Sequence, residues 1–575
     1  MTAPVARARP QARWVMPTPV DPAVIAALAA ELHLPPIVCE LLCRRGYLDV
    51  DPAKRYLRPR LDQLHDPERL LGLPVAVERL ARAITGGETI LVHGDYDVDG
   101  ICSTTILVRT IRALGGRVVP FIPRRLEDGY DLTMAGVRAA IAEKASIIVT
   151  CDCGTSARET VATACAEGID VIVSDHHLPG GPLPDCLAVI NPRQTGCDYP
   201  DKDLAAAGIA FKIALALMKR LGGDENVVLS MLDLVAMATI ADVAPLRGEN
   251  RIFARYGLRL MANSPTLGLR ALIRAVGLAG KPLTAGRVGF TLAPRLNAAG
   301  RLGHALRGVQ LLTTEDEHEA NVIARELEEL NQQRQQVDRA TLADARKKLE
   351  QTDLDARWGL VLSQEGWHPG VIGIVASRIV EETCRPVVMV SLDGGEGKGS
   401  GRSIPAFDLH AGLVACRDLF LRFGGHRSAA GLTIERSRLE EFEQRFDAVA
   451  HERLTIDDLV PEVRVDVVVP LSALSGDLET LLRHFEPHGI GNASPVFAIT
   501  GARLGATPRL VGQGHLKLWL NHEDKYIDAI GWGMGSLIPE LENWGVMDVA
   551  FRLERDDWNG QPRLQAKLAD VRRHV

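Results

Sequence analysis

The chain has 575 residues, with 46% hydrophobic and 24% charged side chains, which excludes a mainly disordered or collagen-like protein. It has 66 basic and 73 acidic residues, and the net charge of −7 excludes a strongly basic nucleic-acid coat. At roughly 150 residues per domain, this length predicts three to four domains. No apolar run approaches the roughly 18 residues of a membrane span, and the ten cysteines form no Cys-x-x-Cys pair. We therefore expect a reduced, cytoplasmic chain.

The first part of the chain predicts a helical extension followed by an α/β domain. In residues 1–75, short helical patterns are interrupted by prolines. In residues 76–314, β-branched apolar runs alternate with amphipathic stretches such as Ser103–Leu114 and Leu132–Lys144, a pattern typical of a parallel sheet. The predicted strands are Thr89–Val92, Val118–Ile122, Ile147–Thr150, Val171–Ser174 and Ala188–Ile190.

The second part of the chain predicts a connecting helix and two further domains. Residues 315–352 contain almost no helix breaker and are rich in Glu, Gln, Arg, Ala and Leu, which favours one long helix joining two domains. A smaller α/β domain is expected over residues 353–453. Residues 454–575 are mostly strand-like and predict a small β-barrel, in which Asn559-Gly560 is a hairpin turn signal.

Residues with metal-ligand chemistry follow several predicted strands. The first strand runs into the acidic stretch His93 to Gly100, the third into Cys151 to Gly154, and the fourth into Asp175-His176-His177. A further apolar run, Leu234–Ile240, is followed by Ala241-Asp242-Val243. Because ligand sites form at the carboxyl ends of strands in open α/β sheets, we expect these carboxylates and imidazoles to meet at one edge.

Carboxylates gathered in this way repel one another unless cations neutralise them. Two divalent metal ions roughly 3.5–4 Å apart and bridged by a shared carboxylate solve that problem, and they suit phosphoryl transfer. The mixture of aspartate with histidine favours Mn²⁺ or a similar ion over a site of oxygen ligands for Ca²⁺.

Each motif alone also has a structural interpretation. An Asp-x-Asp-x-Asp-Gly stretch is often a solvated turn or a calcium loop, but position 12 counted from Asp95 is Ile106, so the bidentate glutamate of that loop is missing. Cys151 and Cys153 are more typical of buried thiols than of zinc ligands, because no second Cys/His pair lies at finger spacing. An isolated His-His pair is usually structural. The occurrence of all four motifs in this order favours a metal site.

The motif series resembles a known family. The segments 95–100, 152–154, 175–177 and 241–243 are similar to the signature motifs of the DHH phosphoesterase superfamily, and 367–378, 399–403 and 424–426 resemble the associated DHHA1 domain. With the C-terminal barrel and the segment Pro294 to Arg301, the chain resembles the RecJ family of single-strand-specific 5′→3′ DNA exonucleases. The resemblance covers nearly the whole chain from about residue 40, and it implies that the barrel is an OB fold.

The resemblance implies roles for the motif residues. One metal ion would be held by His93, Asp97 and Asp152, and the other by Asp99, Asp152, His176 and Asp242. Asp152 would bridge the two ions, and Asp175 would orient a ligand imidazole. His177 would face the scissile phosphate and stabilise charge in the transition state. For Asp95 we expect a local hydrogen-bonding role in its loop.

The same resemblance implies a set of substrate-binding residues, which are Arg125, Arg301, Ser400, Arg402 and His426. Arginine forks, hydroxyls and glycine-rich backbone suit the binding of phosphate. The chain departs from the family pattern at Asp131, where glycine is expected after Gly129-Tyr130.

The OB fold implied by the resemblance would bind a single strand with basic and stacking side chains. The candidates are Lys517, Trp519, Trp532, Trp558 and Arg563. At least one of these tryptophans is expected to belong to the barrel core instead. A helicase and a single-strand-binding protein are implied as partners, and a monomer fits an enclosed DNA channel.

The sequence therefore predicts a metal-dependent 5′→3′ exonuclease that acts on single-stranded DNA in repair and recombination and releases 5′-mononucleotides with Mn²⁺ or Mg²⁺. One alternative is a phosphodiesterase for oligoribonucleotides or cyclic dinucleotides, but such relatives lack the N-terminal extension and the barrel. The other is a non-catalytic replication scaffold, which the full set of ligand residues disfavours.

Overall fold

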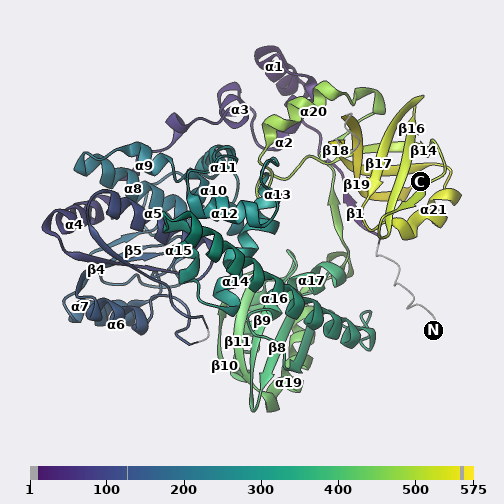
Figure 1. The fold of residues 1–575 in the computed structure, drawn as a ribbon. Coiled ribbons are helices and arrows are strands. Elements are labelled where there is room, and N and C mark those ends of the chain that lie inside the picture. Colours follow the sequence, from purple (N-terminus) through teal and green to yellow (C-terminus); the bar gives the residue numbers. More distant parts are fainter. Residues whose placement is uncertain (1–10, 126, 557–561, 575) are drawn as a thin grey trace. The chain divides into compact units, whose positions relative to one another are not determined.

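The computed structural model describes residues 11–125, 127–556 and 562–574 (Figure 1). The chain divides into two compact units. The first unit comprises Lys54–Arg334 and Phe485–Ser494. The second comprises Met1–Ala53, Gln335–His484 and Pro495–Val575. Both units are therefore built from segments that are far apart in the sequence.

The first unit is organised around a five-stranded parallel sheet with the strand order β3-β2-β4-β5-β6. All five predicted strands are confirmed, and their central residues are buried because helices cover both faces. The strands are β2 Thr89–Gly94, β3 Arg117–Phe121, β4 Ala145–Cys151, β5 Asp170–Ser174 and β6 Ala188–Ile190.

Two groups of helices cover this sheet (Figure 1). One face packs against α6 (Met134–Ala142) and α7 (Arg158–Ala166) through residues such as Leu91 and Val137. The other face packs against α4 (Leu73–Gly86), α5 (Val98–Ala113) and α8 (Ala206–Leu221). The helix expected over Ser103–Leu114 thus begins five residues earlier, because the Asp97 side chain accepts the N–H groups of Asp99 and Gly100 and caps α5 there.

The apolar run Leu234–Ile240 was expected to be a strand, but it is helical. It belongs to the helix α10 (Leu232–Ala241), which is buried almost all round. A short apolar run has the same pattern in a buried helix as in a buried strand, and the packing of α10 against α5, α8 and α11 decided between them.

The remaining part of the first unit is helical. It comprises α9 Glu225–Leu229, α11 Gly248–Met261, α12 Leu267–Ala275, α13 Ala285–Arg287, a π-helical turn Val288–Leu292, α14 Ala293–Leu302 and α15 Leu306–Thr313. The helix α3 (Val50–Leu57) contains the boundary between the units, which falls after Ala53.

A buried ion pair joins two of these helices. The Lys212 ammonium of α8 lies 2.6 Å from the Glu249 carboxylate of α11, and neither side chain is more than 1% exposed. Glu249 also accepts hydrogen bonds from the Tyr199 hydroxyl and the His65 N–H, while Lys212 donates to the His65 carbonyl. Each charge therefore has several polar partners, as a buried pair requires.

The long helix predicted near residue 315 is observed as α16 (Glu317–Glu350). In its N-terminal half, Ala320, Ile323 and Leu327 belong to the core of the first unit. In its C-terminal half, Leu342 and Leu349 belong to a core of the second unit. Both units thus use part of this helix.

The second unit contains a five-stranded mixed sheet of order β10-β11-β9-β8-β7, in which only β7 and β8 are parallel. The helix α17 (Ile372–Thr383) lies against β8 and β9, and α18 (Leu409–Val414) and α19 (Leu439–Arg453) contribute to a second apolar core. The strands are β7 Leu360–Glu365, β8 Val387–Asp393, β9 Glu396–Arg402, β10 Phe420–Gly425 and β11 Ala429–Glu435.

The C-terminal residues form a closed five-stranded barrel, because β14 pairs with both β18 and β16. Successive side chains of β16 point alternately into and out of the barrel. Leu516, Leu518 and Leu520 are therefore buried, whereas Trp519 is 43% exposed. The barrel strands are β14 Phe497–Leu504, β16 His515–His522, β17 Lys525–Gly531, β18 Met547–Asp556 and β19 Arg563–Arg573, with β13 Val467–Val468 and β15 Arg509–Val511 beside them. The turn predicted at Asn559-Gly560 lies outside the described residues.

The N-terminal residues also belong to the second unit. The helices α1 (Pro22–Leu32) and α2 (Pro36–Arg44) were expected, but the strand β1 (Arg13–Val15) was not. It pairs in parallel with β12 (Glu462–Arg464), and Trp14 donates to Asp570. Within the described residues, no single helix is long and apolar enough to span a membrane. The helices α1 and α2 meet the criteria of length and composition when they are taken together, but a bend of 117° separates them.

The buried ion pair gives a prediction for stability. We expect Glu249→Ala to lower the free energy of unfolding by about 3–5 kcal/mol, because it leaves the Lys212 ammonium buried without its counter-charge. The control is Glu78→Ala, which removes the half-exposed pair with Arg220 and should cost less than about 1 kcal/mol. Denaturant unfolding of both variants measures the difference, and equal losses would contradict the prediction.

Candidate metal centre and catalytic site

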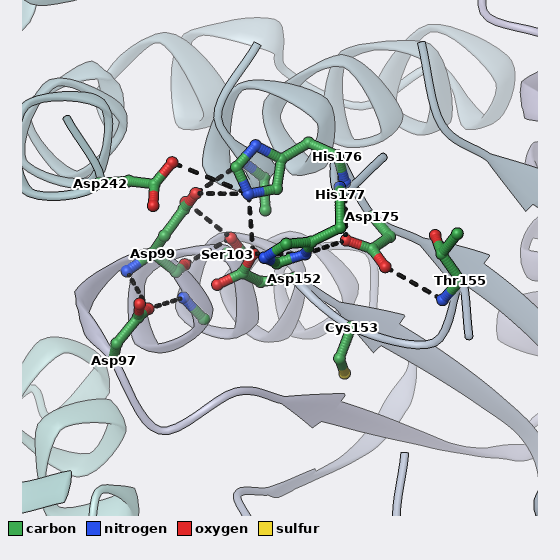
Figure 2. Close-up of polar contacts among 12 residues, drawn as sticks. Asp97, Asp99, Ser103, Asp152, Cys153, Thr155, Asp175, His176, His177 and Asp242 are labelled. Carbon is green, nitrogen blue, oxygen red and sulfur yellow. Dashed lines mark hydrogen bonds and ion pairs between the residues drawn. The ribbon is translucent and has the colours of Figure 1, made fainter. Parts of the chain in front are cut away.

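The candidate site lies at the carboxyl edge of the parallel sheet. Asp152 follows β4, and Asp175, His176 and His177 follow β5. Asp97 and Asp99 come from the start of α5, and Asp242 comes from the end of α10. Figure 2 shows that these side chains converge, with Asp242, Asp99 and Asp152 around the His176 ring.

His176 is the centre of one ligand group. Its Nε2 lies 3.1 Å from an oxygen of Asp152, 3.7 Å from one of Asp242 and 3.9 Å from one of Asp99. The Asp99 carboxylate is held in place by the N–H groups of Ala206 and Ala207 in the first turn of α8, at 2.8 and 2.7 Å. Asp99, His176 and Asp242 thus form one cluster with metal-ligand geometry.

A second ligand group consists of Asp95, Asp97 and Asp152, whose nearest oxygens lie within 4.8 Å of one another. Asp152 contacts both groups, as a bridging carboxylate would. The backbone at Asp152 has φ = +67°, and that at Val243, next to Asp242, has φ = +60°. Aspartate tolerates such a value, but it is costly for the β-branched Val243, and strain of this kind concentrates at functional sites.

The three residues that group together here are Asp95, Asp97 and Asp152. His93 was expected in this second group, and its role as a ligand stays a prediction. The His93 ring packs against Phe121, with 5.2 Å between centroids, and its Nδ1 lies 3.6 Å from the Cys153 sulfur. A side chain at Gly136 would collide with this ring. Strand alternation explains the placement, because His93 shares a sheet face with Leu91, the face covered by α6 and α7.

The clustered carboxylates are electrostatically strained. Burial, followed by the charge of Asp97, raises the pKa of Asp99 to about 7. Burial, followed by the charge of Asp99, raises the pKa of Asp242 to about 8. Burial and the same neighbouring charges raise the pKa of Asp152 well above its usual range. Protons or cations must therefore compensate the site near neutral pH.

Several buried atoms of the site fit divalent metal ions. The Asp152 Oδ1 and the His176 Nε2 face one another at 3.1 Å, yet neither has a hydrogen-bond partner, and the same holds for the Asp95 Oδ1. Burial, followed by the positive charge of His177, lowers the pKa of His176 to about 4, so its ring is neutral and can coordinate. Unpaired lone pairs in a buried acidic cluster are the donors that Mn²⁺ and Mg²⁺ require.

His177 differs from His176 in its partners. Its Nδ1 lies 2.7 Å from the Asp175 carboxylate, which also accepts the N–H groups of His176, His177 and Thr155. Burial alone would lower the pKa of His177, but the hydrogen bond and charge of Asp175 outweigh it and raise the pKa to about 9. Asp175 thus contacts the His177 ring, and its expected role of orienting a metal-bound imidazole stays a prediction. A cationic His177 can stabilise charge on a phosphate.

Tyr130 is a neighbour of His177 that the sequence analysis did not single out. Its hydroxyl lies 3.3 Å from the His177 Nε2. In the sequence, its place directly before Asp131, where the chain departs from the family pattern, was the only signal for it. The Arg125 guanidinium lies over the Tyr96 ring at 5.0 Å, and Tyr96 contacts Tyr130 edge to face.

The other expected substrate-binding residues fall in both units. Arg301 lies in α14 of the first unit. In the second unit, the Ser400 hydroxyl accepts a hydrogen bond from Arg402 at 3.2 Å, and both side chains flank Gly373 in the first turn of α17. His426 follows β10 and accepts the Ser428 N–H. Ser400 and Arg402 thus form a paired donor set at a helix N-terminus, where phosphate binds well.

The candidate DNA-binding residues of the barrel lie in different surroundings. Trp519 and Arg563 line a cavity of about 190 Å³ together with Tyr526, Asp528, Leu471 and Leu474. Trp532 is 58% exposed and contacts His515, while Lys517 is paired with Asp528. Trp558 lies outside the described residues.

Comparison with family models assigns all three domains. Residues 89–239 match the DHH family N-terminal domain, 358–452 the DHHA1 domain and 465–570 the RecJ OB domain. The chain is 37% identical over 559 residues to the single-stranded-DNA-specific exonuclease RecJ of Salmonella typhimurium, covering 94% of this chain and 96% of that protein. The chain belongs to the RecJ family.

Solved structures agree with this assignment. The crystal structure of RecJ in complex with Mn²⁺ from Thermus thermophilus matches with a TM-score of 0.85 and 36% identity, covering 98% of this chain and 80% of that one. The corresponding Mg²⁺ complex matches with a TM-score of 0.80 and 34% identity, over 98% and 79%. Both structures of this relative contain an ion of the kind that the donor set of the present site fits.

The pKa shifts predict how stability depends on pH when metal is removed. The folded-state pKa values of Asp99, Asp242 and His177 all lie above their unfolded values of about 3.9, 3.9 and 6.5, so the folded protein binds more protons. Stability in chelator should therefore fall as the pH rises from about 6.5 to 9. The lowered pKa of His176 acts in the opposite direction only below about 6.5.

Because metal binding requires deprotonated carboxylates, we expect the gain in Tm from added Mn²⁺ to be larger at pH 8.5 than at pH 6.5. Thermal unfolding in chelator and in Mn²⁺ at both pH values measures this difference. A chelated protein that became more stable between these two values would contradict the prediction.

Proposed function

We propose that the chain is a metal-dependent exonuclease that degrades single-stranded DNA from its 5′ end and releases 5′-mononucleotides during repair and recombination. The observation that carries the proposal is the pair of ligand clusters, Asp95–Asp97–Asp152 and Asp99–His176–Asp242, which meet where Asp152 lies 3.1 Å from the His176 Nε2. The names of the relatives, which are single-stranded-DNA-specific exonucleases, support the substrate.

The proposed metal ligands are chosen from the donors that converge in the site. One ion would be held by Asp95, Asp97 and Asp152, and the other by Asp99, Asp152, His176 and Asp242. His93, implied by the family resemblance, is proposed as an additional ligand because its buried Nε2 has no hydrogen-bond partner. When bound, two Mn²⁺ or Mg²⁺ ions would supply Lewis acidity and lower the pKa of a bound water.

The proposed reaction is hydrolysis of the first phosphodiester bond. The oxygen of a water molecule joins phosphorus, the bond from phosphorus to the 3′ oxygen breaks, and the 3′ oxygen takes up a proton. This leaves a 5′ phosphate on the shortened strand. His177 would face the phosphate and stabilise its negative charge, and Asp175 would keep the imidazole cationic.

The proposed substrate contacts are arginine and hydroxyl groups. Arg125, Arg301 and His426 would hold the DNA backbone. Ser400 and Arg402 would bind the phosphate at the 5′ end, a role that their pairing at the start of α17 supports. Recognition of a terminal phosphate would give the enzyme its direction.

The cellular setting is also proposed. The ten cysteines are all free thiols, which supports the cytoplasm as the location. Because the chain would need single strands to be supplied and kept open, we propose a helicase and a single-strand-binding protein as partners. We propose that it acts as a monomer.

The direct test uses a single strand with a 5′ phosphate and a label at its 3′ end. Progressive shortening from the 5′ end is expected in Mn²⁺ or Mg²⁺ and none in chelator. Asp152→Asn is the matched control, because asparagine tolerates the positive φ at this position but lacks the bridging charge. We expect this variant to lose activity by more than about 10³-fold.

Two other outcomes would contradict the proposal. Tight DNA binding without shortening in any metal would indicate a non-catalytic scaffold. Failure to bind DNA, with hydrolysis of an oligoribonucleotide or a cyclic dinucleotide, would indicate a small-substrate phosphodiesterase.

For the barrel, we predict that Trp519 stacks on a base of the single strand. Its side chain is exposed and faces a cavity with Tyr526 and Arg563. Trp519→Ala should weaken binding of a long single strand by about 1–3 kcal/mol, because one base loses its stacking partner. Fluorescence anisotropy measures the affinity, with the exposed Leu510→Ala as control. Equal effects of both variants would contradict the prediction.

A further inference from the structure

The ring of His177 needs more than one anchor to be held in one orientation. The side chain is 49% exposed, so packing alone leaves it free on one side. The hydrogen bond from Nδ1 to Asp175 fixes one nitrogen, but the ring can still rotate about that contact. A second hydrogen bond at Nε2, on the far side of the ring, removes this freedom.

Tyr130 supplies the second contact. Its hydroxyl oxygen lies 3.3 Å from the His177 Nε2, and the two rings meet edge to face with 6.2 Å between centroids. Tyr130 is itself 51% exposed, and the edge-to-face contact with Tyr96 supports it from another side. The hydroxyl therefore reaches the imidazole from a ring that has its own support.

The backbone next to Tyr130 is fastened to the loop that carries Asp152. Asp131 has φ = +77°, a conformation in which glycine is unstrained and aspartate is tolerated. Its carboxylate accepts the Gly154 N–H at 2.6 Å and the Leu132 N–H at 2.9 Å. The departure from glycine at this position thus ties the Tyr130 segment directly to the segment Asp152–Gly154.

From these contacts we infer that Tyr130 is a positioning residue for the nuclease reaction, which holds the His177 imidazole in the orientation that presents it to the scissile phosphate. The inference rests on the proposed role of His177. It assigns to Tyr130 no contact with the metal ions, so metal affinity should not depend on its hydroxyl.

A double-mutant cycle tests the inference on the full-length protein. Tyr130→Phe keeps the ring and removes only the hydroxyl, and we expect kcat to fall about three- to tenfold with KM within about twofold. His177→Gln should lower kcat by about 10²-fold or more. If Tyr130 acts through His177, adding Tyr130→Phe to His177→Gln should change kcat by less than about twofold.

Two further measurements separate positioning from damage. Mn²⁺ affinity, followed by the EPR signal of the free ion, and Tm in chelator should both be unchanged in Tyr130→Phe. Tyr256→Phe, which removes the hydroxyl of a half-buried tyrosine in α11, is the matched control and should retain full activity.

Distinct results would overturn distinct claims. Unchanged kcat in Tyr130→Phe, an equal loss in both backgrounds, or weaker Mn²⁺ binding would each overturn the inference about Tyr130. Unchanged kcat in His177→Gln would instead overturn the role of His177 in the proposed function.

Discussion

The repulsion among buried carboxylates at one sheet edge is the constraint on which the site depends. Asp152 shares its surroundings with Asp99 and Asp242, and burial together with these charges raises its pKa. The fold offsets part of the cost through the first turn of α8, whose two N–H groups bind the Asp99 carboxylate. The rest must come from protons or cations. Divalent ions bound among these carboxylates would remove this repulsion.

The two adjacent histidines of one motif are suited to different chemical roles. His176 points its unpaired Nε2 at three carboxylates and is kept neutral by burial and by the charge next to it. His177 is held by Asp175 and becomes cationic. One imidazole is thus suited to coordinate and the other to stabilise negative charge, although they are consecutive in the chain. The difference lies in which polar groups each ring reaches.

Each domain carries residues that are proposed for a different part of the function. The parallel sheet carries the metal centre, the mixed sheet carries the Ser400 and Arg402 pair, and the barrel presents Trp519 outward. In the proposed function these groups would serve as the reactive centre, the end-binding group and a surface that follows the strand. The sharing of α16 between two cores shows that neither unit is complete without part of this helix.

Much of the fold and the membership of the site were determined by the sequence. The five strands were predictable because buried β-branched runs between turn signals have few other structures available. Asp152, Asp175 and His176 were predictable because they follow strands whose carboxyl ends meet at one edge, whereas Asp242 was predictable from its motif alone and reaches the site from the end of α10. For Leu234–Ile240, the short apolar run was compatible with both a helix and a strand, and the packing around α10 decided for the helix.

The sequence also could not show that Asp95 joins the second cluster while the ring of His93 turns toward Phe121, because strand pleating and the space at Gly136 decide where that ring goes. The contact between Tyr130 and His177 likewise joins segments 47 residues apart, and only tertiary structure brings them together.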